Sequence, residues 1–169
     1  MTALILTFIG RDRPGLVRAI ASRVAGKGGL WLESRLVRLA GQFSGVVRVE
    51  AAPELVAELS AALHGLEVEG LKVTIATAEA ETRETPELLS LELLCLDRPG
   101  IVSEVAAALT ALEVNIEEFE SEVVAAAFTG HPMFKASARL SAPAGLALET
   151  LRQRLETLAA EMMADLSLT

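Results

Sequence analysis

Two spacings of apolar residues alternate along the chain, and their order predicts the secondary structure. Near the start, Leu4, Leu6 and Phe8 occupy every second position, which is typical of a strand with one buried face. The next segment has apolar residues three and four positions apart, which predicts an amphipathic helix that ends in the glycine-rich segment 26–29. The apolar stripe of this helix comprises Leu16, Val17, Ile20, Ala21 and Val24.

The remainder of the first half predicts a hairpin, a second helix and a last strand. Residues 30–39 and 43–49 indicate two strands around a turn at 40–42. A second helix begins at Pro53, and the alternation of apolar residues over 71–75 indicates the final strand. The order is therefore strand, helix, strand, strand, helix, strand.

The second half predicts the same order of elements after a polar segment without apolar period, 79–87, which indicates a linker. The chain therefore divides into a first module at 1–78, the linker at 79–87 and a second module at 88–169. The predicted elements of the second module are strand 88–96, a helix from Ile101 to Leu109, strands 115–124 and 133–140 around a turn at 129–132, helix 148–162 and strand 165–168.

A repeated motif supports this division. Asp12-Arg13-Pro14-Gly15 returns 85 residues later as Asp97-Arg98-Pro99-Gly100, each time between the first strand and the first helix. Such a repeat indicates a duplicated structural unit. Right-handed crossovers would bring both helices of a unit onto one face of an antiparallel sheet, so we expect an α+β fold of two tandem ferredoxin-like modules. Because modules of about 80 residues bury small cores, we also expect association, most simply a homodimer.

Composition narrows the possible partners. Fifteen Lys and Arg against 23 Asp and Glu give a net charge of −8, which opposes direct binding to nucleic acid. The chain contains no uncharged apolar run of about 18 residues, so no membrane span is expected. The apolar start, Met1 to Ile9, lacks the basic region and cleavage site of a secretory leader, so we expect a strand there and a cytoplasmic protein.

The titratable residues give no pattern for catalysis or for a metal. Cys95 is the single cysteine and lies in an apolar run, so we expect a buried thiol. With His64 and His131 it forms no convincing zinc set, and neither histidine has a nearby arrangement of Ser, Cys or carboxylate that implies catalysis. We therefore expect no catalytic residue, no metal and no cofactor.

An acidic segment follows in the second module. Glu118, Glu120 and Glu122 would share one side of a strand, either as a solvated face paired with Arg98 or Arg139, or as a site for an amine or divalent cation.

The repeated motif itself allows two interpretations. Proline suits the first helical turn, glycine permits a close approach, and the Asp carboxylate can cap the free amides of the helix. The motif is then a well-capped turn between strand and helix. Alternatively, uncapped N–H groups and the helix dipole form an anion site that suits the carboxylate of a ligand.

In its placement, this motif resembles the same position in the ACT domain, a small amino-acid-sensing module. The tandem layout, together with Glu33-Ser34-Arg35 and Asn115-Ile116-Glu117-Glu118, is similar to the glycine cleavage system transcriptional repressor family. The resemblance implies an effector between the loop after the first strand and the start of the second strand, often across a domain interface. It implies these candidate contacts: Asp12, Gly15, Leu16, Asp97, Arg98, Gly100, Ile101, Asn115 and Ile116.

The two modules differ at the best side-chain candidate. Asn115 can donate to a carboxylate and accept from an ammonium group, which suits a zwitterion, although a turn-capping role explains it nearly as well. Leu30 stands at the equivalent position of the first module, which either lacks this polar contact or binds through its backbone.

We therefore expect a non-enzymatic protein that senses a small amino acid, glycine if the resemblance holds. Its effect on transcription would pass through a protein partner that binds DNA, because the chain is acidic and has no helix-turn-helix pattern. Two alternatives remain: a ligand-free adaptor that assembles through sheet edges, and a detached regulatory subunit of an amino-acid enzyme.

Overall fold

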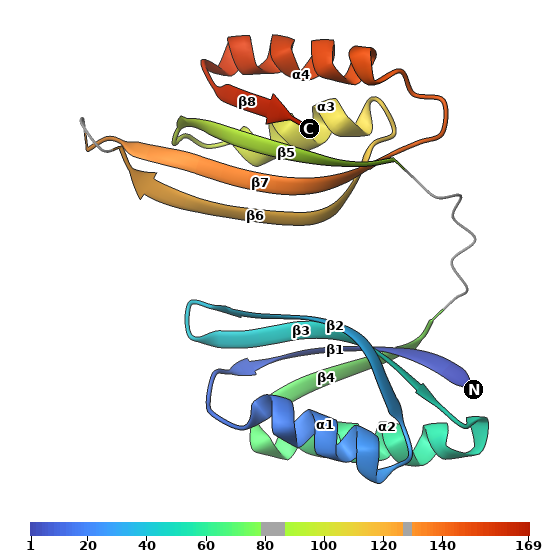
Figure 1. Cartoon of the computed structure of the whole chain (residues 1–169). Helices are drawn as coiled ribbons and strands as arrows, with labels where there is room; N and C mark the ends of the chain where they lie inside the picture. Colours follow the sequence, from blue (N-terminus) through green and yellow to red (C-terminus); the bar gives the residue numbers. More distant parts are fainter. Residues whose placement is uncertain (79–86, 127–129) are drawn as a thin grey trace. The chain divides into compact units, whose positions relative to one another are not determined.

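The protein is described by a computed structural model that covers residues 1–78, 87–126 and 130–169. The chain divides into two compact units, Met1–Glu81 and Thr82–Thr169, each with its own sheet and helices (Figure 1). The boundary falls within the segment that we predicted as a linker. Residues 79–86 of that segment lie outside the described residues, whereas Glu87 is the first residue of a strand.

The first module contains four strands, two α-helices and two short 3₁₀ helices. Its sheet has the order β2-β3-β1-β4, and all neighbouring strands are antiparallel. The elements are β1 (Thr2–Arg11), α1 (Leu16–Gly26), β2 (Leu30–Leu39), β3 (Gln42–Ala51), η1 (Pro53–Leu55), α2 (Val56–His64), η2 (Gly65–Glu69) and β4 (Leu71–Thr77).

The second module repeats this arrangement with the sheet order β6-β7-β5-β8, again antiparallel throughout. In both modules the helices lie on one face of the sheet (Figure 1). The predicted α+β fold of two ferredoxin-like modules is thus confirmed. The elements are β5 (Glu87–Leu96), α3 (Ile101–Thr110), β6 (Asn115–Ala125), β7 (Pro132–Ala142), α4 (Leu148–Met162) and β8 (Asp165–Leu168).

Each module has its own hydrophobic core between sheet and helices. In β1 the residues with even numbers, Leu4, Leu6 and Phe8, are buried, as the period of two predicts. In α1 the buried residues Leu16, Ile20 and Val24 stand four positions apart and form the stripe that packs on the sheet. The second core contains the corresponding residues of β5 and α3, including the buried thiol of Cys95.

A few boundaries differ from the sequence-based expectations. The second helix starts at Pro53 with a 3₁₀ turn and becomes α-helical only at Val56. Strand β7 starts at Pro132, inside the predicted turn 129–132, of which Thr129 lies outside the described residues. Strands extend past their apolar residues because the backbone ladder continues as long as a partner strand lies beside it.

Candidate functional site

Both copies of the repeated motif end in a glycine whose backbone conformation other residues adopt only with strain. Gly15 has φ of 94° and Gly100 has φ of 96°, both in the left-handed region where a side chain is strained. Each glycine is the N-cap of the following helix. The motif thus turns the chain sharply from the first strand into the first helix.

Of the two interpretations of the motif, the one in which the aspartate carboxylates cap the helices is wrong. Neither α1 nor α3 has a side-chain hydrogen bond at its N-cap. The carboxylate of Asp12 instead pairs with Nε of Arg38 at 2.7 Å, and Asp97 uses its backbone N–H, which donates to the carbonyl of Pro132 at 3.0 Å. Since the N-cap position belongs to the glycine three residues later, the aspartates stand too far back to reach the helix amides.

The first turns of both helices therefore keep N–H groups without a helical acceptor. The first intrahelical bond runs from the N–H of Ala19 to the carbonyl of Gly15 at 2.9 Å, and from Glu104 to Gly100 at 3.0 Å. The N–H groups of the three residues between each pair precede this bond. Together with the helix dipole, such groups favour an anion.

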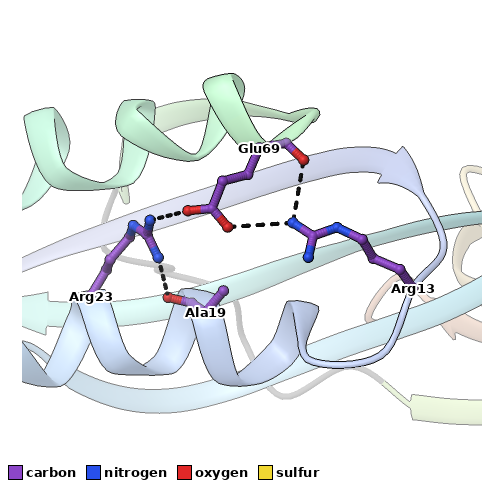
Figure 2. Close-up of polar contacts among 4 residues, drawn as sticks. All are labelled: Arg13, Ala19, Arg23 and Glu69. Carbon is purple, nitrogen blue, oxygen red and sulfur yellow. Dashed lines mark hydrogen bonds and ion pairs between the residues drawn. The ribbon is translucent and has the colours of Figure 1, made fainter.

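In the first module the side chain of the motif arginine, Arg13, extends toward Glu69 (Figure 2). Arg13 Nη2 donates to the carbonyl and to the carboxylate of Glu69, both at 3.3 Å. The second carboxylate oxygen of Glu69 accepts from Arg23, whose other nitrogen donates to the carbonyl of Ala19 at 3.1 Å. These contacts tie η2 to α1 and leave the surface above Gly15 open, because a Cβ there would meet no atom within 4 Å.

In the second module the motif arginine closes back on its own helix. Arg98 donates through both terminal nitrogens to the two carboxylate oxygens of Glu104, at 2.6 and 2.7 Å. This bidentate bond lowers the pKa of Glu104 and raises that of Arg98. A Cβ on Gly100 would stand 3.3 Å from the Glu104 carboxylate, so the ion pair lies beside this glycine.

Asn115 lies at the start of β6 within a small polar cluster. Its amide donates to Glu117 Oε1 at 2.8 Å, and the hydroxyl of Ser141 donates to the same oxygen at 2.5 Å. A β-bulge between Ile116 and Glu118 leaves Glu117 outside the regular pairing. Ser141 is only 7 % exposed, so this bond satisfies a buried hydroxyl.

Within the second module, this polar cluster and the motif lie at opposite ends of the sheet. Asn115 stands opposite Ser141, which pairs with Leu88 at the start of β5, whereas the motif follows Leu96 at the end of β5. At about 3.3 Å per residue, the two ends are about 30 Å apart. The structure therefore brings Asp97, Arg98, Gly100 and Ile101 together but separates them from Asn115 and Ile116.

Three of the candidate contacts are core residues. Leu16 and Ile101 are 4 % and 2 % exposed, and Ile116 packs against the second core. Their side chains are thus directed into the modules. Only their backbone groups remain as possible contacts for a ligand.

The acidic strand β6 forms a paired, exposed face. Arg139 pairs with Glu118 at 3.3 Å and Lys135 with Glu122 at 3.8 Å. Arg98, the other partner that we considered, pairs with Glu104 instead. Among the described residues no group of three metal-ligating side chains forms, and no helix there is long and apolar enough to cross a membrane.

The sequence interpretation missed two acids that hold the motif arginines. Glu104 had a signal, because it stands four residues after Gly100 where the first module has Ala19. No signal in the sequence pointed to Glu69, since 56 residues separate it from Arg13.

The chain is thus a tandem of two ferredoxin-like modules, each with a left-handed glycine turn before its first helix. Residues 2–75, which make up most of the first module, match the family model of the ACT domain. The whole chain is similar to an unknown protein from Galdieria sulphuraria, with a TM-score of 0.85 and 25 % identity over 99 % of this chain and 96 % of that chain.

A second structure also matches over the full length. It belongs to a protein provisionally named a glycine cleavage system transcriptional repressor, with a TM-score of 0.76 and 15 % identity over 99 % of this chain and 96 % of that chain. At this identity the likeness establishes the fold, which both modules share. No curated protein matches the sequence.

Proposed function

We propose that this chain is a non-enzymatic regulatory protein that binds a small amino acid at its Asp-Arg-Pro-Gly turns. The observation that carries the proposal is the start of α1 and α3. At each start the N-cap is a left-handed glycine, and no side chain caps the first N–H groups of the helix. These groups are suited to the carboxylate of an amino acid. The match of residues 2–75 to the family model of the ACT domain supports the same function.

In the second module, Asn115 would supply the other half of the site. Because Asn115 and Gly100 stand at opposite ends of one sheet, a single ligand reaches both only when two second modules from two copies of the chain meet. The proposal therefore includes a homodimer. Light scattering of the purified chain tests this part, and a mass of one 17.9 kDa chain at all concentrations would contradict it.

The output of binding would be a changed contact with a protein partner in the cytoplasm. The full-length structural relative is named for transcriptional repression in glycine metabolism, which makes glycine the first ligand to test. The net charge of −8 disfavours direct contact with DNA, so the partner would be a DNA-binding regulator.

A thermal-shift screen with the twenty amino acids tests ligand binding. A ligand at 100 times its Kd stabilises the folded state by about 2.7 kcal/mol, which raises the melting temperature by several degrees. Asn115→Ala should remove the shift if the amide contacts the ligand. Ser90→Ala, on the first strand of the same sheet, serves as a control for small changes in stability. If no amino acid moves the midpoint, the sensing function is wrong.

The alternative of a ligand-free adaptor draws on one observation in the first module. Leu30, at the position equivalent to Asn115, is 53 % exposed and stands opposite Glu50. Its side chain offers no amide to a ligand. An exposed apolar residue on an edge strand suits assembly with another chain. The further alternative, a regulatory subunit of an amino-acid enzyme, predicts a catalytic chain that copurifies with this protein.

A further inference from the structure

The sheet of each module has one face without helices. The helices of a module lie on one side of its sheet, so its described helices leave the opposite side uncovered, and we call this side the open face (Figure 1). Along β1 the residues with odd numbers lie on the open face, because Leu4, Leu6 and Phe8 are buried under the helices. The strand register then assigns the residues of the other strands to one face or the other.

The register also shows which positions of the two open faces are equivalent. The second strand of each module has a β-bulge after its second residue, Trp31 in β2 and Ile116 in β6, which are 85 residues apart like the two motifs. The same offset relates β1 to β5. One row across the first open face contains Arg35, Val46, Thr7 and Thr74, and the equivalent row of the second contains Glu120, Ser137, Glu92 and Ser167.

Two pairs of equivalent positions carry opposite charges. Arg35 in the first of these rows stands where the second module has Glu120. In the neighbouring row Lys72 pairs with Ile9, and Asp165 pairs with Leu94, which is 85 residues after Ile9. Lys72 is therefore equivalent to Asp165. The two open faces share one backbone pattern and differ in the sign of these charges.

The sum over all paired positions gives the same contrast. The first open face has a net charge of +2 and the second has a net charge of −3, and most of the charged side chains are exposed. The charged residues are Arg11, Arg35, Arg48, Lys72, Glu33 and Glu50 on the first open face, and Lys135, Arg139, Glu92, Glu118, Glu120, Glu122 and Asp165 on the second.

Exposed apolar side chains lie between these charges on both open faces. Ile9, Val37 and Val46 are exposed on the first open face, and Leu94 and Leu96 on the second. Apolar side chains that gather on one face and are surrounded by polar residues are typical of a surface that binds another protein. The opposite charges indicate which surface each face suits.

We propose that the open face of the first module binds the open face of the second module of another copy of this chain. Two such contacts, one in each direction, close a twofold dimer. Sheets that pack face to face lie about 10 Å apart, so the apolar side chains of both faces interdigitate. Opposite charges favour this pairing, whereas two first faces or two second faces would repel each other. The contact differs from a meeting of two second modules and needs no amino acid.

Exchange of the reversed charges tests this pairing in the full chain. The wild type should have twice the mass of the 17.9 kDa chain in light scattering. Arg35→Glu with Lys72→Asp makes the first open face acidic, and Glu120→Arg with Asp165→Lys makes the second one basic. In each variant like charges then face each other, so the Kd of the dimer should rise about 100-fold.

A mixture of the two variants gives the decisive measurement. Each variant then supplies the face that the other requires, so equal amounts of both should restore the dimeric mass. Exposed positions of α4, on the helix side of the sheet, provide matched controls. Arg152→Glu with Arg154→Glu, and Glu156→Arg with Glu161→Arg, change the net charge equally and should leave the dimer intact. Circular dichroism verifies that every variant is folded.

A mass of one chain for the wild type at all concentrations would overturn the inference. A dimer that survives both exchanges, or a mixture that stays monomeric, would also overturn it. The amino-acid screen gives a separate result. If the mixture restores the dimer while no amino acid shifts the melting temperature, the pairing of the open faces stands and amino-acid sensing fails.

Discussion

At the scale of single residues, the glycines of the repeated motif matter through their backbone. With φ of 94° and 96°, Gly15 and Gly100 hold conformations that a side chain adopts only with strain. At Gly15 this strain would come from the backbone conformation and not from a steric clash, since a Cβ there meets nothing within 4 Å. The motif therefore depends on glycine for the direction of its turn.

Gly15→Ala should lower the free energy of unfolding by about 1–2 kcal/mol because alanine must adopt positive φ. Chemical denaturation measures this change. The matched control is Gly26→Ala at the end of α1, where φ is not positive and the space is open, so a neutral or slightly stabilising effect is expected. An equal loss in both variants would contradict the role of the left-handed turn.

The Arg98–Glu104 ion pair predicts a pH dependence. The hydrogen bond from Arg98 lowers the pKa of Glu104 in the folded protein, so the pair stabilises the fold above the ordinary glutamate pKa. This stabilisation is lost as the pH falls through the lowered pKa. Denaturation of wild type and Glu104→Gln should therefore differ at neutral pH and converge in acid; a difference that is constant with pH would refute the ion pair.

At the scale of elements, the helices are held by packing rather than by caps. None of the N-cap side chains of the four α-helices makes a capping hydrogen bond in the described ranges. In α4, Leu151 and Leu155 are fully buried on the sheet. Burial of such side chains provides most of the stability of a helix in a small module.

Leu155→Ala should accordingly cost about 2–5 kcal/mol, the loss of burial plus the cavity that remains. Differential scanning calorimetry measures the change in the melting transition. Thr157→Ala, an exposed position on the same helix, should change stability little. A similar cost for the two substitutions would mean that α4 is not anchored through its buried stripe.

At the scale of the whole molecule, the net charge hides an uneven distribution. Residues 1–78 contain nine Lys and Arg against seven Asp and Glu, whereas residues 88–169 contain five against twelve. The acidity that opposes nucleic acid thus belongs to the second module and the linker. The total charge, considered alone, conceals the basic residues around the turn and helix of the first module.

Even so, a surplus of two positive charges is small for a phosphate-binding surface, so the purified chain should not bind duplex DNA at moderate salt. Fluorescence anisotropy with a labelled duplex measures this. The chain should join a complex with DNA only after a DNA-binding partner is added. Tight binding by the chain alone would overturn the proposal that the protein affects transcription through a DNA-binding partner.

The sequence by itself determined the duplication, the order of strands and helices and most of both cores. These features could be predicted because the spacing of apolar residues is a local property of each element, as Leu4, Leu6 and Phe8 show for β1. The positions of both glycine turns also followed from the sequence, since proline and glycine act on their own backbone.

Only the tertiary structure decided which charged groups meet. Arg13 pairs with Glu69, which is 56 residues away, and Asn115 stands at the far end of the sheet from Gly100. Such pairings depend on strand register and on where each connection ends, which no local pattern encodes. The two motif arginines therefore have different kinds of partner: the fold brings Glu69 to Arg13, whereas Glu104 stands on the helix of its own motif.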